Sequence, residues 1–197
     1  MPQYKRKDHY YQQAKQKGFK SRAAFKLLDI HKKFRLIKPG MEVVDLGCAP
    51  GGWLQVLSKE VGTTGHVVGI DLNRMDEIPE KNIDFIQGSI EDEQTVQLLF
   101  TKLGKRVDLV TSDMSPNLSG VKFQDRFHSY QLSLKAFDLC CKVLRRGGHF
   151  VVKIFPGEDL EEFKQQMKEK FVKVQQFVPD STRKTSVEVY LIGKEFK

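Results

Sequence analysis

The sequence predicts an α/β fold, with a doubly wound, mostly parallel sheet of seven strands and an antiparallel C-terminal hairpin. From residue 42 onward, short apolar runs rich in β-branched residues alternate with amphipathic helical patterns. The first run ends in a glycine-rich turn that leads into a helix. The last two runs are separated by PDSTRKTS at 179–186, which is too short for a crossover helix, so this pair should form the hairpin.

The seven apolar runs define the expected strands: EVVDL (42–46), HVVGIDL (66–72), IDFIQG (83–88), RVDLVTSD (106–113), HFVVKIF (149–155), VKVQQFV (172–178) and SVEVYLI (186–192). Helical patterns between most of them cover 53–61, 92–103, 126–145 and 158–171. Gly147 and Gly148 should end the third of these helices. Ahead of the first strand, the pattern predicts one amphipathic helix over 10–34, which KPG at 38–40 stops.

Length and composition indicate one domain over 1–197, because 197 residues that are 40% hydrophobic can bury one core. No run approaches the roughly 18 apolar residues that a membrane span needs, and the charged N-terminus contains no secretory segment. The three cysteines form no CxxC pair, and the five histidines lack ligand spacing. We therefore expect a cytoplasmic, monomeric protein that binds neither membrane nor metal.

Positive charge is concentrated at the N-terminus. Residues 1–40 hold twelve Lys and Arg against Asp8 and Asp29, a net +10, so the rest of the chain carries −2 of the total +8. Five aromatic residues are interleaved with this charge: Tyr4, Tyr10, Tyr11, Phe19 and Phe25. A basic helical arm of this kind, at about 1–38, suits an RNA backbone with some base stacking, although a solvated charged helix has the same composition.

The glycine-rich turn, DLGCAPGGW at 45–53, indicates the class of ligand. Gly47, Gly51 and Gly52 do not make the dinucleotide pattern G-x-G-x-x-G, and Pro50 removes a backbone donor that a pyrophosphate would need. Asp71 ends the second strand, where a carboxylate can bind the two hydroxyls of a ribose. A ribose without a pyrophosphate describes S-adenosylmethionine, whereas a tight turn without any ligand can also be glycine-rich.

Four charged residues stand where the pattern is otherwise apolar or ends a strand. Lys153 interrupts HFVVKIF, and Glu188 interrupts SVEVYLI. Asp113 ends the fourth strand, and Lys26 lies on the apolar side of the first helix. Because an unpaired buried charge costs several kcal/mol, each of them needs a partner or an open strand end. They are candidates for a polar site, and structural ion pairs are the alternative.

As a set, five segments resemble the FtsJ-type (RrmJ, RlmE) ribose 2′-O-methyltransferases, over almost the full chain and in the same order: YYQQAKQKGFKSRAAFKLLDI, VVDLGCAPGGW, SDMSPNLSG, VVKIF and PDSTRKTSVEVY. The resemblance implies a Rossmann-like methyltransferase that uses S-adenosylmethionine to methylate RNA. The catalytic tetrad of that family falls on Lys26, Asp113, Lys153 and Glu188, with Lys153 as the proton acceptor.

The resemblance also assigns the cofactor contacts, which fall on Gly51, Trp53, Asp71 and Asp113. Ser89 stands where relatives carry an acid beside the adenine, so either Ser89 makes a weaker contact with the base or Asp92 assists it. A base would take the proton of the attacking ribose hydroxyl, but Lys153 could instead position that hydroxyl while the proton leaves to solvent. The sequence leaves both roles open.

The resemblance favours a uridine of large-subunit (23S) ribosomal RNA as the target, because the chain is a minimal single domain. Transfer RNA is the alternative, since the first basic segment is similar in the tRNA-directed branch. A non-catalytic RNA-binding module with the same fold is a further alternative, which the complete tetrad disfavours. Incorporation of methyl groups into RNA separates an enzyme from such a module.

Overall fold

The computed structural model describes residues 8–183 and 185–197 of the chain. Tyr4, Lys5, Arg6 and Lys7 of the predicted arm lie outside the described residues. The elements in chain order are α1 (His9–Gln16), α2 (Ala24–Phe34), β1 (Glu42–Leu46), α3 (Gly52–Val61), β2 (His66–Asp71), β3 (Ile83–Gln87), α4 (Glu93–Leu103), β4 (Val107–Ser112), α5 (Lys122–Val143), β5 (Leu144–Ile154), α6 (Leu160–Lys170), β6 (Phe171–Phe177) and β7 (Val189–Phe196).

The strands form one seven-stranded sheet in the order β3-β2-β1-β4-β5-β7-β6. Strands β1 to β5 pair with one another in parallel, whereas β7 runs antiparallel to both β5 and β6. The predicted fold class is therefore confirmed, including the C-terminal hairpin. Because β7 is inserted next to β5 in the opposite direction, its first residues lie at the edge where β1, β2, β4 and β5 end.

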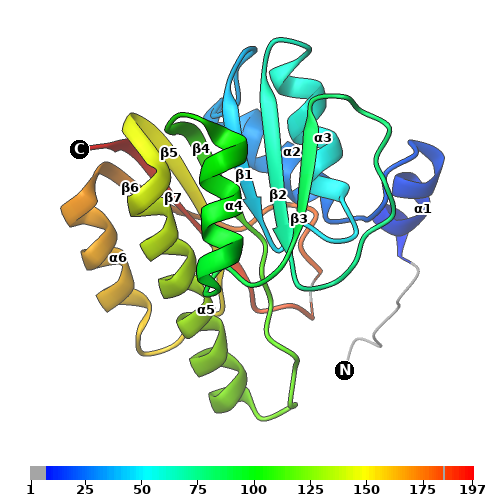
Figure 1. Cartoon of the computed structure of the whole chain (residues 1–197). Helices are drawn as coiled ribbons and strands as arrows, with labels where there is room; N and C mark the ends of the chain where they lie inside the picture. The colour runs from blue at the N-terminus through cyan, green and yellow to red at the C-terminus, as the bar shows by residue number, and fades with distance from the viewer. Residues whose placement is uncertain (1–7, 184) are drawn as a thin grey trace.

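Helices cover both faces of the sheet (Figure 1). One core cluster joins the strands to α4, α5 and α6, and the other joins them to α2 and α3. Successive residues of a strand face opposite sides, so Val43 belongs to the second cluster and Val44 to the first. Because both faces of these strands are covered, their sequences are nearly continuous apolar runs. In the described part of the chain, no helix is long and apolar enough to cross a membrane.

The expectation of one helix over 10–34 is wrong, because α1 and α2 are separate helices. The chain turns at Gly18, which adopts a left-handed conformation with φ of 73°. Phe19 N donates to Ala14 O at 2.9 Å and closes the end of α1. The ring of Phe19 then packs edge-on against Phe25 of α2, with centroids 5.7 Å apart. Glycine at the turn, rather than the apolar periodicity, decides where the helix stops.

The expected end of the long helix at Gly147 and Gly148 is also wrong. Helix α5 ends at Val143, and β5 begins at Leu144, so both glycines lie inside the strand. Leu144 pairs with Val107 of β4, and the pairing register then shifts before it resumes at His149. An irregularity of this kind accommodates a residue with positive φ, here Gly147 at 75°.

Candidate active site

The fold brings the four predicted tetrad residues to one edge of the sheet. Asp113 directly follows β4, and Lys153 is the penultimate residue of β5. Glu188 directly precedes the antiparallel β7, which starts at this same edge. Lys26 comes from α2, on the face of the sheet that α2 and α3 cover. Residues separated by up to 162 positions in the sequence therefore meet at one place.

Two ion pairs organise these side chains. Lys153 Nζ lies 3.1 Å from Asp113 Oδ1 and donates a hydrogen bond to the Asp113 carbonyl oxygen at 2.6 Å. Lys26 Nζ lies 2.6 Å from Glu188 Oε1. Lys153 is only 6% exposed and Glu188 only 8%, so neither charge could be kept here without its partner.

Tyr190 connects the two pairs. Its hydroxyl donates to Asp113 Oδ1 at 2.6 Å, and the Lys26 ammonium lies 5.9 Å from the centre of its ring. Burial, and next the Asp113 carboxylate, raise the pKa of Tyr190 well above its ordinary value, so the hydroxyl stays protonated. Our sequence interpretation missed this residue, although Tyr190 shares the strand face of Glu188 by the alternation of period two.

Asp113 is a carboxylate in this setting. Burial by itself would raise its pKa, but the ammonium groups of Lys153 and Lys26, together with the Tyr190 hydrogen bond, hold the pKa of Asp113 below its ordinary value. Its negative charge is thus shared among two cations and a phenol. Lys153 is therefore not its exclusive counter-ion.

Another acid, Asp45 of β1, is buried close enough to the site to interact with the charges of Asp113 and Asp71. It is 1% exposed and accepts a hydrogen bond from Thr111 Oγ1 at 2.7 Å, while its Oδ2 has no partner among the described residues. Burial raises the pKa of Asp45 well above its ordinary value, and the charges of Asp113 and Asp71 raise it further. This environment favours the protonated, neutral form of Asp45. The sequence signal was available, because Asp45 interrupts an apolar strand as Lys153 does.

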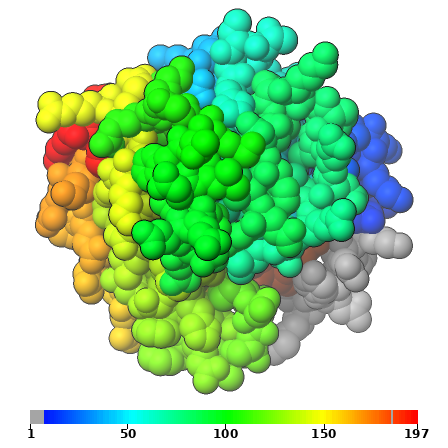
Figure 2. Space-filling view, viewed as in Figure 1, coloured from blue at the N-terminus to red at the C-terminus, as the bar shows by residue number. Residues whose placement is uncertain are grey.

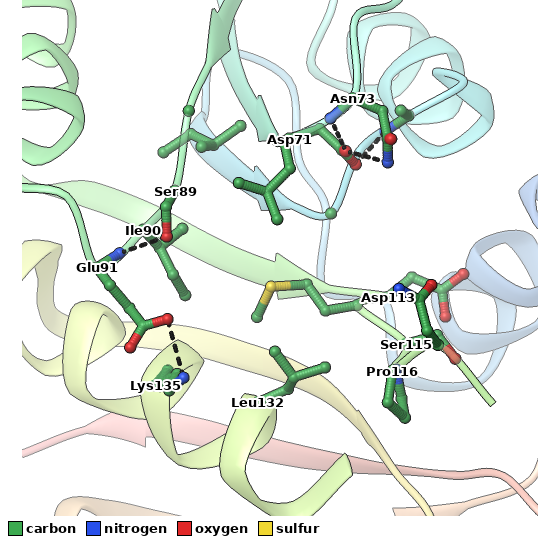
Figure 3. Close-up of a pocket in the computed structure, with 17 residues that line it drawn as sticks. Asp71, Asn73, Ser89, Ile90, Glu91, Asp113, Ser115, Pro116, Leu132 and Lys135 are labelled. Carbon is green, nitrogen blue, oxygen red and sulfur yellow. Dashed lines mark hydrogen bonds and ion pairs between the residues drawn. The ribbon is translucent and has the colours of Figure 1, made fainter. Parts of the chain in front are cut away.

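A cavity of about 490 Å³ opens at the same edge of the sheet. Figure 3 shows Ser89, Ile90 and Glu91 on one side of it, with Asp113, Ser115 and Pro116 opposite. The lining residues are Gly47, Ala49, Ile70, Asp71, Leu72, Asn73, Gly88, Ser89, Ile90, Glu91, Asp113, Met114, Ser115, Pro116, Asn117, Leu132 and Lys135. Asp113 belongs to both the cavity and the ion-pair cluster, so a group bound in the cavity can reach the tetrad.

Three of the predicted cofactor-binding residues line this cavity, namely Asp71, Ser89 and Asp113. Glu91, which the sequence interpretation passed over, also lines it and pairs with Lys135 Nζ at 2.8 Å. Asp92, the alternative for the adenine, is instead the residue that precedes α4 and is absent from the lining.

Gly51 and Trp53 lie outside the lining. Gly51 has φ of 106°, and a Cβ there would come within 2.5 Å of Ile78 Cδ1, so only glycine fits the turn. Trp53 is buried, donates from Nε1 to Ala23 O at 2.8 Å and packs against the ring of Tyr190. Both residues therefore pack next to the site and do not line its cavity in this structure.

The comparison with known proteins identifies the family. The profile described as FtsJ-like methyltransferase matches residues 19–196. The chain belongs to the FtsJ-like methyltransferase family. It is 43% identical over 189 residues to a protein of Halorubrum lacusprofundi and 44% identical over 189 residues to one of Methanothrix thermoacetophila, both named ribosomal RNA large subunit methyltransferase E. These alignments cover 95% and 96% of this chain, and 70% and 72% of the relatives.

A solved structure from Plasmodium falciparum, described as a ribosomal RNA methyltransferase, has the same fold as this FtsJ-like chain. The TM-score is 0.80 at 31% identity, and the match covers 90% of this chain and 98% of that one. The resemblance on which the sequence interpretation depended is therefore confirmed at the level of family and fold.

The methyl donor of this FtsJ-like methyltransferase is S-adenosylmethionine, and the cavity fits that molecule. Asp71 Oδ1 accepts hydrogen bonds from the backbone and side-chain amides of Asn73, whereas Oδ2 accepts a single one among the described residues, from Ala49 N at 2.9 Å. Oδ2 therefore keeps an acceptor site for a ribose hydroxyl. Ile90 and Leu132 supply apolar surface of the kind that an adenine ring needs.

Proposed function

We propose that this protein transfers a methyl group from S-adenosylmethionine to the 2′-hydroxyl of a ribose in large-subunit ribosomal RNA, at a uridine. The observation that carries the proposal is the ion pair between the buried Lys153 and Asp113, because Asp113 also lines the cavity that fits the methyl donor. The names of the relatives support ribosomal RNA as the substrate. We also propose that the protein acts in the cytoplasm as a monomer.

Lys153 is the group that handles the proton of the attacking hydroxyl in this proposal. In its ammonium form it has three N–H donors, and two of them are directed to the side chain and the carbonyl of Asp113. We assign the third direction to the ribose oxygen. After Lys153 has released a proton to solvent, its amine can accept the proton of the 2′-hydroxyl as the new oxygen–carbon bond forms.

S-adenosylmethionine supplies the methyl group on a positively charged sulfur, so the bond that breaks leaves a neutral thioether. The chain's own task is to hold the hydroxyl in line with that bond and to take its proton. Asp113 fixes the Lys153 amine, and the Lys26–Glu188 pair is placed to orient the ribose. This division of roles explains why the four charges are held in two ion pairs, each with one buried partner.

The experiment that tests the proposal uses labelled S-adenosylmethionine with naked large-subunit ribosomal RNA, intact large ribosomal subunits and bulk transfer RNA. A 2′-O-methyl group blocks alkaline cleavage of the adjacent phosphodiester, so a gap in the hydrolysis ladder identifies the modified nucleotide. We expect a single gap at a uridine of the ribosomal RNA and none with Asp113→Ala. A methyl group on a base would contradict ribose methylation, and a gap only in transfer RNA would contradict the ribosomal substrate.

A further inference from the structure

The start of α5, together with the loop before it, forms an exposed apolar surface, which we call the α5 extension (residues 118–128). Phe123 is 75% exposed and Phe127 is 47% exposed. In the preceding loop, Leu118 is 67% exposed and Val121 is 51% exposed. Burial against the rest of the described chain begins only at Ser129. A contiguous patch of large apolar side chains at the surface commonly marks an interaction site.

The backbone of the α5 extension is held in place by its own hydrogen bonds. Asp125 Oδ1 accepts from the backbone amide of Ser119 at 2.8 Å and from its hydroxyl at 2.9 Å. Ser119 Oγ in turn accepts from Val121 N at 3.1 Å. The hydrogen bond from the Ser119 amide lowers the pKa of Asp125, which is therefore a carboxylate at neutral pH. The exposed rings are thus presented by an ordered segment.

The α5 extension continues directly from the candidate active site. Asn117 lines the cavity, and Phe123 follows it by six positions, a distance of at most about 22 Å along the chain. At the base of the extension, Ser129 Oγ accepts from Phe155 N at 2.9 Å, two residues beyond Lys153. In Figure 2 the light-green atoms of this part of the chain lie at the lower margin of the molecule, open to solvent.

We propose that the α5 extension is a stacking platform for unpaired nucleobases of the RNA that flank the target nucleotide. Phe123 and Phe127 are four residues apart and so share one side of the helix. Lys122 and Arg126 stand beside them, and this mixture of rings and cations matches single-stranded RNA, whose bases stack on aromatic rings while its phosphates pair with cations. The inference rests on the proposed function, because it takes RNA as the substrate that is bound at Lys153.

The test compares Phe123→Ala, Phe127→Ala and the double variant with a matched control, Phe100→Ala on α4, which removes another exposed ring (42% exposed). Binding is measured by fluorescence anisotropy on the RNA fragment that the wild-type protein methylates, as a single strand and as a perfect duplex. Each lost stack should weaken single-strand binding about 5- to 150-fold and leave duplex binding nearly unchanged. Calorimetry with S-adenosylhomocysteine and thermal unfolding should show no change, because both rings are at the surface.

Two further variants separate stacking from other apolar contacts. Phe123→Trp should keep RNA affinity, whereas Phe123→Leu, which keeps the apolar surface without a ring, should lose it. Wild-type affinity in the double variant, an equal loss on the duplex, or full rescue by leucine would each overturn the proposal, and rescue by leucine would point to a protein partner. If the wild-type protein methylates no RNA, the proposed function itself fails. If the double variant methylates RNA as the wild type does, the proposed function stands and the stacking platform alone is contradicted.

Discussion

Four side chains at the sheet edge are held in two ion pairs, each with one buried partner, and a fifth, Tyr190, connects them through a hydrogen bond to Asp113. Burying a charge costs desolvation free energy that the attraction of its partner only partly offsets. Ion pairs of this kind are therefore an inefficient way to make a core more stable. The cost of these ion pairs is consistent with a catalytic role for the four residues.

Asp45 gives a prediction about stability and pH. Its pKa is raised in the folded state, so the folded protein keeps a proton that the unfolded chain loses above pH about 4. This contribution to stability is complete below that pH and is lost as the pH rises toward the folded-state pKa, by at most about 1.4 kcal/mol per pH unit. Asp45→Asn removes the titration, so its stability relative to the wild type should increase as the pH rises from 4 to 8.

Urea unfolding of both proteins across this pH range measures that difference. The quantity to compare is the free energy of unfolding of Asp45→Asn minus that of the wild type, since other titrating groups then largely cancel. A difference that stays constant with pH would show that Asp45 is ionised in the folded protein.

At the scale of elements, α1 and α2 are attached to the turn between β6 and β7. Asp8, which caps α1, accepts hydrogen bonds from Arg22 and from Arg183 Nε. In α2, Asp29 Oδ2 accepts from the amide and the hydroxyl of Ser181. The basic N-terminal segment is thus docked beside the turn that leads to Glu188, so RNA bound along it would pass close to the tetrad.

This placement gives a prediction about RNA binding. Lys15, Lys17 and Lys20 are exposed, and changing all three to Gln should weaken RNA binding and flatten the plot of log affinity against log salt by about 2 units. The matched control changes Lys168, Lys170 and Lys173, three exposed lysines of α6 and β6 that lie outside the N-terminal segment. Equal effects of the two triple variants would mean that the arm is an ordinary solvated surface.

The sequence was sufficient for the strands and the sheet class, because runs covered on both faces must be apolar. It also revealed Lys153 and Glu188, since a charge inside such a run needs a partner. It failed for the helix over 10–34, because apolar periodicity continues across Gly18 while the backbone there turns. The order of residues in a loop does not tell which way a side chain points, so the contact of Trp53 with the cofactor stays a prediction.

For the whole molecule, we propose that residues 1–197 form one cooperative domain. The last strand, β7, lies between β5 and β6, and Tyr190 of that strand shares a core cluster with Leu27 of α2. The two ends of the described chain therefore complete the same core. Neither end can be removed without exposing residues that the other covers.

Unfolding should accordingly occur in one transition. Calorimetry should give a measured enthalpy equal to the van't Hoff enthalpy, and near-ultraviolet and far-ultraviolet circular dichroism should change together. Two separate transitions, or an early loss of the signal from Trp53 while the sheet remains folded, would contradict a single domain.

We infer that Lys153 takes the proton of a ribose hydroxyl, and single-turnover methyl transfer by Lys153→Ala and Lys153→Arg measures whether it does. A positioned base contributes about 10²- to 10⁴-fold, so the rate with alanine should fall at least that far, while binding of S-adenosylhomocysteine and RNA persists. Arginine keeps the charge but does not deprotonate near neutral pH, so the account predicts an equal loss with arginine. Turnover by Lys153→Arg close to that of the wild type would show that Lys153 only positions the hydroxyl and would contradict the account.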